Sequence, residues 1–401
     1  MRFRLASSAD VFSILKLFHK SNTGASPSSA FLDYKKLSHT IDRKDSRWIL
    51  TEMDGAPVTA IGLMLEPNQK LCKINKILVD ADSAKTQLLI QESLRYCLHF
   101  LETETDMDVV YTTTLSLTRQ QQDCTAKEGF KVFGVFPNAL GEDNTALNGL
   151  TAYFLRNSLQ EKRYTKIALH PVVAKFFAIA ASQCNIPQLP VADYGAILEE
   201  LRSFEKENEG APVPQLELIR APEFVRAKFQ DLMAKKSQIA NFYPFYRPNC
   251  LITDPKQDIE IFIDIYETKR FAAIIGEHVK KSVHPVSLYN EVQKLLRRNN
   301  VSYIEVINDA GDSFGNECII RGGFTPCAYF PAFKSQGNVR RDYVVFGRSF
   351  EYLCQPDTNV GKTYMEFFKE YLRVEMHKYF ADLTPASDGI LQEIFSDSTK
   401  K

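Results

Sequence analysis

The sequence predicts two related α+β domains in tandem, each built on a mixed α/β sheet, followed by a C-terminal helix. The chain has 401 residues, which exceeds the size that one hydrophobic core usually serves. Its 44% hydrophobic and 24% charged residues are typical of a folded globular protein. Two further observations predict this fold: an internal repeat, and the same order of strand and helix patterns in both parts of the sequence.

The repeat is clearest where a Gly-Phe pair is followed, after five residues, by Phe-Pro. The first copy runs from Gly129 to Pro137 and the second from Gly323 to Pro331, an offset of 194 residues. The same shift places the apolar segment 108–112 on 302–306, and closely similar shifts place 75–79 on 270–275 and 150–154 on 342–346. Self-similarity in a constant order predicts a duplicated structural unit.

Alternation and β-branched runs predict the strands of the first unit, and a 3.6-residue apolar period predicts its helices. Ser8 and Asp10 are expected to begin a helix after a first strand. Asp54-Gly55 is a strong hairpin signal. The expected strands are 2–6, 48–51, 58–63, 72–79, 108–114, 130–136 and 150–156, with helices after Asp10, over 85–101 and ending at 128.

The second unit repeats this plan. Its expected elements are a strand at 216–220, a helix after Pro222, and a hairpin of 250–253 with 259–265. A connecting helix is predicted over 166–184, an exposed linker over 204–214, and a last amphipathic helix over 360–379 with Phe367, Phe368, Tyr371, Leu372 and Met376 as its apolar stripe. The expected divisions are an N-terminal domain 1–160, a connecting helix and linker 161–214, a C-terminal domain 215–352 and a helical extension 353–401.

Charge and residue spacing argue against several classes of function. Lys plus Arg and Asp plus Glu both number 49, so no net field favours nucleic acid or an anionic membrane as a partner. The first residues lack the apolar core of a secretory signal, which predicts a cytoplasmic protein. Widely spaced cysteines and histidines predict no metal site. The run Gly361-Lys362-Thr363 resembles the end of a P-loop, but Pro356 stands where the first glycine belongs.

The order of elements resembles the GNAT superfamily of acyl-CoA N-acyltransferases over about 150 residues of each half, and segment 120–137 is its best local match. The resemblance implies that two adjacent parallel strands separate and that the pantetheine arm of acetyl-CoA lies between them. Ile77, Leu78 and Val79 would form one edge of that slot. Tyr111, Thr112, Thr113 and Thr114 would form the other, where hydroxyls could hold a water or an acceptor amine; alternatively, these threonines simply suit a strand.

The pyrophosphate-binding turn of that family departs from its pattern here. Segment 80–89 contains no glycine, although Lys85, Thr86 and Gln87 could still bind a phosphate. The other reading is a plain helix start capped by Asp82 or Ser83. The corresponding segment 276–287 also lacks a glycine pair, so the second unit is expected to be a non-catalytic copy. Its cations Lys280, Lys281 and His284 are more typical of a solvated loop than of an anion site.

The resemblance implies direct acyl transfer from the thioester to an amine. The backbone amide of Val79 is the candidate for polarising the thioester carbonyl, with Thr113 and Thr114 beside it. Many family members carry a tyrosine acid four residues before Gly-Phe, but this sequence has Thr125 and Ile319 there. Water or another residue would then have to protonate the departing thiolate.

The expected function is therefore an acetyl-CoA-dependent N-acetyltransferase acting on an unknown small-molecule or peptide amine, with acetyl-CoA as co-substrate. The alternative is a degenerate, non-enzymatic tandem module that binds an acyl-CoA or a protein partner. Transfer of an aminoacyl group from tRNA is a third possibility, which the balanced charge disfavours. The sequence does not determine the oligomeric state.

Overall fold

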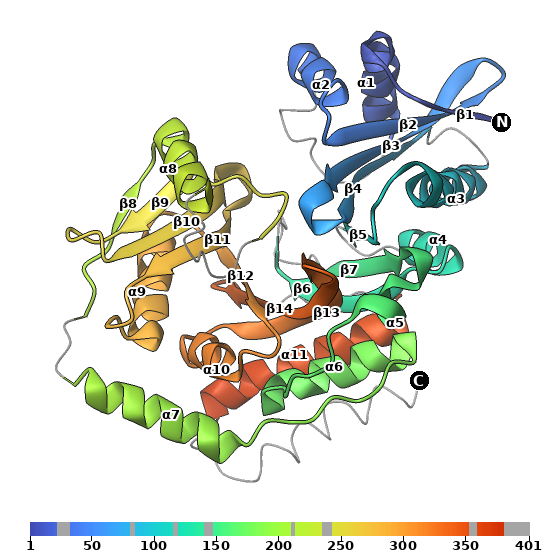
Figure 1. Ribbon diagram of the computed structural model, residues 1–401. Coiled ribbons are helices and arrows are strands. Elements are labelled where there is room, and N and C mark those ends of the chain that lie inside the picture. The colour runs from blue at the N-terminus through green and yellow to red at the C-terminus, as the bar shows by residue number, and fades with distance from the viewer. Residues whose placement is uncertain are drawn as a thin grey trace.

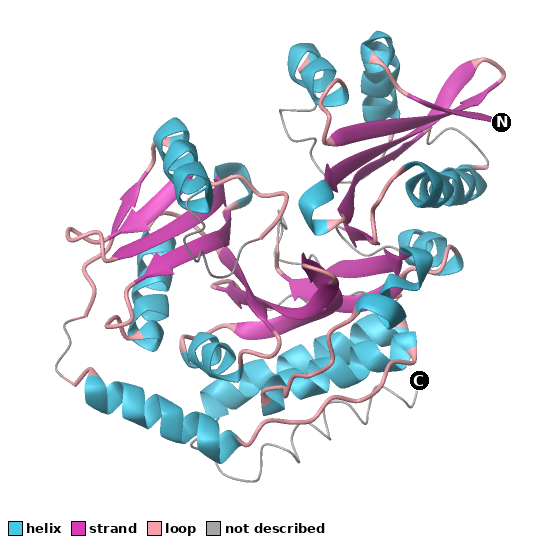
Figure 2. Ribbon diagram, in the orientation of Figure 1, coloured by secondary structure: helices cyan, strands magenta, loops and turns pink. Residues whose placement is uncertain are grey.

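A computed structural model describes residues 1–21, 33–80, 85–114, 119–139, 147–209, 213–234, 243–352 and 359–380. The fold is a mixed α/β structure in which a single curved sheet runs through the whole molecule (Figures 1 and 2). The order of its strands is β1-β2-β3-β4-β5-β7-β6-β13-β14-β12-β11-β10-β9-β8. We call β1–β7 with their helices the first half, and β8–β14 with theirs the second half.

The first half contains both hairpin strands and both crossover helices expected from the sequence. Its strands are β1 (Arg2–Leu5), β2 (Ser46–Met53), β3 (Ala56–Glu66), β4 (Leu71–Val79), β5 (Val109–Thr114), β6 (Lys131–Pro137) and β7 (Leu147–Phe154), and its helices are α1 (Val11–Lys20), α2 (Tyr34–Ile41), α3 (Thr86–Glu104) and α4 (Arg119–Lys127). Asp54 and Gly55 form the β2–β3 turn with φ angles of 53° and 80°, a conformation that favours glycine at the second position.

The second half has the same strand order when it is read from the opposite edge of the sheet. Its strands are β8 (Glu217–Ile219), β9 (Cys250–Thr253), β10 (Ile259–Tyr266), β11 (Phe271–Val279), β12 (Tyr303–Asp309), β13 (Thr325–Gln336) and β14 (Val339–Ser349), and its helices are α8 (Pro222–Ala234), α9 (Pro285–Arg298) and α10 (Ser313–Arg321). In both halves one parallel pair interrupts an otherwise antiparallel sheet: β4 with β5, and β11 with β12.

One detail of the expected repeat is wrong. Leu71 begins β4 and pairs with Val109, whereas Phe271 begins β11 and pairs with Tyr303. The offset is therefore 200 residues at β4 and 194 at β5, and segment 75–79 does not correspond to 270–275. The cause lies in the crossover that contains α3, which is longer than the crossover that contains α9: the two helices have 19 and 14 residues.

The two halves meet where β6 lies beside β13. Ala328 is the register partner of Gly134, and a Cβ atom on Gly134 would lie 2.1 Å from that of Ala328. Two helices far apart in sequence, α6 (Pro171–Cys184) and α11 (Lys362–Phe380), lie side by side beneath this junction (Figure 1). Their rings pack on each other and on the sheet, as in the pairs Phe176–Phe367 and Phe177–Tyr329, so both helices cover the strands that join the halves.

The segments between and after the halves differ in part from expectation. The connecting helix is shorter than 166–184, because Pro171 starts α6 and His170 caps it. Two further helices are α5 (Ser158–Lys162) and α7 (Tyr194–Glu207), and α7 contains the first residues of the expected linker 204–214. Helix α11 occupies most of 360–379, with Phe367, Phe368 and Tyr371 buried. No helix in the described part of the chain is long and apolar enough to cross a membrane.

Candidate functional site

Strands β4 and β5 separate soon after they begin. Their paired residues are Leu71 with Val109, Cys72 with Val110, and Lys73 with Tyr111. At the next step the hydroxyl of Thr112 donates to the carbonyl of Ile74 at 3.1 Å, in place of a backbone bond. Beyond this point β4 continues to Val79 with no register partner on β5, so the two strands separate, as the resemblance implied; we call the space between them the gap.

The register of β3 and β4 fixes where the amides of β4 point. The amide of Asp80 donates to the carbonyl of Val58 at 2.9 Å, so these two residues form a hydrogen-bonded pair. Hydrogen-bonded and non-hydrogen-bonded pairs alternate along an antiparallel ladder. Ile77 and Val79 are therefore in non-hydrogen-bonded pairs with β3. Their amides and carbonyls point away from β3, toward the gap, whereas Leu78 is opposite Ala60 in a hydrogen-bonded pair.

A bulge precedes these residues. Gly62 pairs with Lys76 while Leu63 pairs with Ile74, which leaves Asn75 as the extra residue on β4. A bulge bends the strand and increases its twist, and this bend separates the end of β4 from β5. The consecutive polar residues Asn75 and Lys76 within an otherwise alternating strand are its signal in the sequence.

The remaining expected site residues are distributed around the slot. Thr113 and Thr114 are half-buried on β5, paired only with β7, so they border the gap from the other side. Gln87 lies in the first turn of α3, Thr86 begins that helix, and Lys85 is its N-cap residue. The proposed caps Asp82 and Ser83 lie outside the described residues. Asp80 forms a 2.9 Å ion pair with Lys20 of α1, which offsets its negative charge at the mouth of the slot.

A cluster of polar side chains that was not expected from the sequence lies at the base of the gap. Lys73 and Tyr111 are the last register pair before β4 and β5 separate, and Glu305 of β12 faces them from the second half. The side chains of Tyr111 and Glu305 are buried, whereas Lys73 is half-buried. The hydroxyl of Tyr111 has no hydrogen-bond partner.

Aromatic rings from the loop that precedes β9 close this cluster. The Lys73 ammonium lies 5.8 Å from the centroid of the Tyr111 ring and 5.2 Å from that of Tyr246. The Phe245 ring contacts the Tyr111 ring with 5.9 Å between centroids. Cation–π contact therefore holds the ammonium between a ring of the first half and a ring of the second.

Burial shifts both charged groups toward their neutral forms. Desolvation raises the pKa of Glu305 to about 8, although the nearby Lys73 lowers it in part. Desolvation likewise lowers the pKa of Lys73 to about 8, against the attraction of Glu305 and with the repulsion of Lys76. A carboxyl and an amine that both titrate near neutral pH can exchange protons with a ligand, which is the property required of general acids and bases.

In the second half, residues at the equivalent edge of β11 form hydrogen bonds within the protein. Strands β11 and β12 also separate after three register pairs, ending with Ala273 and Glu305. The amide of Tyr243 donates to the carbonyl of Ile275 at 3.0 Å, at the bulge of β11. Glu277 takes the position that Ile77 has in the first half, and it is buried against the hydroxyl of Tyr289, 3.2 Å away.

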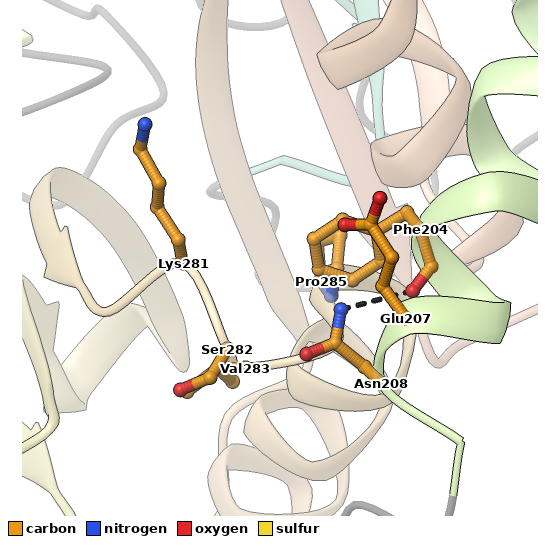
Figure 3. Close-up of a pocket in the computed structure, with 7 residues that line it drawn as sticks. All are labelled: Phe204, Glu207, Asn208, Lys281, Ser282, Val283 and Pro285. Atoms are coloured by element: carbon orange, nitrogen blue, oxygen red, sulfur yellow. Dashed lines mark hydrogen bonds between the residues drawn. The ribbon is translucent and has the colours of Figure 1, made fainter.

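The turn between β11 and α9 is covered by α7. A pocket of about 520 Å³ lies there, shown in Figure 3, lined by Phe204, Glu207, Asn208, Lys281, Ser282, Val283 and Pro285. Of the three expected cations, Lys280 forms an ion pair with Asp258, and His284 lies 3.7 Å from Glu205 and against the Phe204 ring. In Figure 3 the side chain of Lys281 extends away from the other lining residues. These pairings leave no concentrated positive charge at the turn, so it lacks the features of a pyrophosphate site.

Comparison with known proteins gives structural likeness alone. No family model matches the sequence, and no curated protein sequence matches it. Similar solved structures include a probable acetyltransferase from Staphylococcus epidermidis, with 13% identity, TM-score 0.34, and coverage of 38% of this chain and 98% of that one. The ribosomal-protein-S18-alanine N-acetyltransferase from Escherichia coli has 11% identity, TM-score 0.34, and coverage of 41% and 99%.

A third similar structure is a ribosomal L7/L12 α-N-protein acetyltransferase in complex with coenzyme A, with 14% identity, TM-score 0.34, and coverage of 38% of this chain and 93% of that one. Each of these structures thus spans less than half of the present chain. At such identities and scores the likeness carries no argument about activity or substrate, and the site has to be judged on its own geometry.

Proposed function

We propose that this protein is an acetyl-CoA-dependent N-acyltransferase made of two tandem GNAT-type units, of which the first is catalytic. The units correspond to residues 1–160 and 215–352, joined by 161–214 and buttressed by the helix within 353–401. The observation that supports this function most directly is the unpaired edge of β4 beyond Lys73, where the backbone groups of Ile77 and Val79 point away from β3.

Unpaired backbone amides and carbonyls on a strand edge can form hydrogen bonds with the pantetheine arm of an acyl-CoA. A buried backbone amide requires a hydrogen-bond partner, and the amide-containing pantetheine chain provides partners along a strand edge. The Val79 amide points toward the gap, where a donor can stabilise the oxyanion that forms when an amine attacks a thioester. Acetyl-CoA would supply the acyl group as its thioester. Lys85, Thr86 and Gln87 at the start of α3 would meet its phosphates.

The first unit is favoured as the catalytic one because groups at the edge of β11 already have partners in the protein. The Ile275 carbonyl accepts from the Tyr243 amide, Glu277 accepts from the Tyr289 hydroxyl, and α7 covers the following turn. A carboxylate buried at that edge would repel the pyrophosphate of an acyl-CoA. The proposed acceptor is a small-molecule or peptide amine.

Calorimetry with acetyl-CoA and with CoA tests this function. We expect one binding site per chain with a dissociation constant of roughly 1 μM to 1 mM, the range common for enzyme substrates. A second assay follows release of the CoA thiol in the presence of amines. Absence of heat with both ligands would overturn the proposal and leave the non-enzymatic module.

A further inference from the structure

The cluster at the base of the gap breaks a general rule of protein interiors. Tyr111 is 3% exposed, and its hydroxyl is buried without a hydrogen-bond partner. Glu305 is 5% exposed, and no hydrogen bond within the described residues ends on its carboxylate, whose oxygens are not among the fully buried unpartnered atoms and so keep some contact with solvent. Buried hydroxyls are nearly always hydrogen-bonded, and a largely desolvated carboxylate is stabilised by a nearby counter-charge. A polar ligand that contacts both the Tyr111 hydroxyl and the Glu305 carboxylate would satisfy both groups.

The charges in the cluster specify the chemistry of that ligand. The Lys73 ammonium and the Glu305 carboxylate influence each other electrostatically, but no ion pair joins them. A molecule that carries one negative and one positive group can satisfy both, whereas a ligand with a single charge leaves one of them without a counterion. The surrounding rings of Tyr111, Phe245 and Tyr246 favour an apolar body between the charged groups.

We propose that this cluster is the acceptor pocket of the acyltransferase and that it binds a small zwitterionic amine, an amino acid, with Lys73 on its carboxylate and Glu305 on its ammonium. The identification of this ligand as an acyl acceptor rests on the proposed function. The binding pocket itself rests on the contacts of Lys73, Tyr111 and Glu305. Lys73 is the partly exposed member of the cluster, so a ligand would enter past its side chain.

The location suits acyl transfer. Lys73 and Tyr111 form the last register pair of β4 and β5, so a molecule held there lies directly beside the start of the gap. Glu305 comes from β12, in the other half of the sheet. The second unit would thus contribute a residue to the site of the first, which gives the non-catalytic copy a role in the reaction.

The step conserves atoms and charge. The Glu305 carboxylate takes one proton from the bound ammonium, and the neutral amine attacks the thioester carbonyl. A C–N bond forms and the C–S bond breaks, and the second proton on nitrogen passes to the departing sulfur. The products are an N-acyl amino acid, CoA with a free thiol, and a protonated Glu305 that releases its proton to solvent.

Binding without acyl-CoA tests the pocket directly. Calorimetry would be performed with L-leucine and L-phenylalanine, and with two analogues of the latter that keep one charge each, phenethylamine and 3-phenylpropionate. We expect at least one of the two amino acids to bind, and each single-charge analogue to bind at least tenfold more weakly than L-phenylalanine. Glu305→Gln and Lys73→Met should each reduce amino-acid affinity at least tenfold.

A matched control comes from a partly buried ion pair elsewhere in the second half. Glu260 is 6% exposed and pairs with Lys228 of α8, so Glu260→Gln and Lys228→Met remove similar charges away from the cluster. Both should leave amino-acid affinity unchanged.

No binding of either amino acid, equal binding of the single-charge analogues, or full affinity in Glu305→Gln would overturn the proposed pocket. If acetyl-CoA binds while the amino acids do not, the proposed pocket is wrong and the acyltransferase proposal is retained. If the amino acids bind while acetyl-CoA does not, the pocket is retained and the acyltransferase proposal is wrong.

Discussion

Ala328 of β13 lies so close to Gly134 of β6 that no side chain fits between the two strands. A Cβ on Gly134 would lie 2.1 Å from the Cβ of Ala328, 2.4 Å from its Cα and 2.7 Å from the carbonyl of Cys327. Two of these three atoms belong to the backbone, so rotation of a side chain cannot relieve the contact. The pair Gly134–Ala328 therefore determines how closely the two halves approach.

Replacing Gly134 by alanine is expected to destabilise the protein by about 1–3 kcal/mol, because overpacking forces the backbone to move. Urea unfolding followed by circular dichroism measures the change. Gly195→Ala is the control, since Gly195 lies in α7 and its nearest neighbour is the end of the Asp193 side chain. That control should cost little or stabilise the helix. Equal stability of Gly134→Ala and wild type would show that β6 and β13 are not joined as described.

Proline at position 79 should reduce activity strongly while leaving the fold in place. The Val79 amide points away from β3, so its loss removes no ladder bond but does remove the proposed oxyanion donor. We expect a loss of roughly 10²–10³-fold in kcat, the usual effect of deleting such a donor. Thiol-release kinetics and a melting curve measure the two effects.

Proline at position 78 is the matched comparison. Leu78 is opposite Ala60 in a hydrogen-bonded pair and its side chain is buried, so Leu78→Pro should lower the melting temperature far more than Val79→Pro. Full activity of Val79→Pro, or similar destabilisation by both changes, would contradict the assigned direction of the amides.

The Lys73–Glu305 cluster predicts a minimum in stability near pH 8. Glu305 has its pKa raised from 4.5 to about 8, so between these values the folded state binds more protons and stability falls as the pH rises. Lys73 has its pKa lowered from 10.5 to about 8, so between these values the unfolded state binds more protons and stability rises again. The other titratable groups around the pair are Lys76, Tyr111, Tyr243, Tyr246, Tyr303 and Cys327.

Variants separate the two arms of this profile. Glu305→Gln should remove the fall below pH 8, and Lys73→Met should remove the recovery above it. The quantity to compare is the difference in unfolding free energy between wild type and variant at each pH, because other groups then cancel. A difference that does not change between pH 5 and 10 would show that neither group is buried in a perturbed state.

A buried ion pair links the segment after β7 to β14. Arg163 and Asp342 are 2% and 0% exposed and lie 2.6 Å apart, and Asp342 also accepts from the amide of Ala332 at 2.8 Å. Arg163→Met should destabilise the protein by about 3–5 kcal/mol, since it leaves a buried carboxylate without its cation. The exposed pair of Arg226 and Glu223 offers the contrast: Arg226→Met should change stability by less than about 1 kcal/mol. Equal effects of the two changes in chemical denaturation would contradict this description.

Local patterns were sufficient to predict most elements of the fold. The turn at Asp54-Gly55, the paired Gly-Phe segments and the apolar stripe of α11 each depend on residues close in sequence, and each is present. The sequence patterns gave a wrong alignment where the connections between strands differ in length between the two halves. The crossover between β4 and β5 is longer than the one between β11 and β12, so Leu71 corresponds to Phe271. The residues of β4 itself give no sign of this difference in length.

The site was only partly predictable for a related reason. A gap between β4 and β5 follows from element order, and Val79, Thr113 and Thr114 do border it. The cluster of Lys73 with Glu305 joins residues 232 positions apart and depends on how two halves of a sheet curve toward each other. Single charges within apolar strands were its signal, but such charges usually lie on a solvated face.

Hydrogen–deuterium exchange with and without acetyl-CoA tests the central proposal, an acyl-CoA arm in the first gap, most directly. Peptides that contain the end of β4, with the amides of Ile77 and Val79, should exchange more slowly when acetyl-CoA is present. Peptides from the end of β11, with Glu277 and Val279, should be unchanged. Protection at β11 in place of β4, or at neither strand while acetyl-CoA is bound, would contradict the proposal.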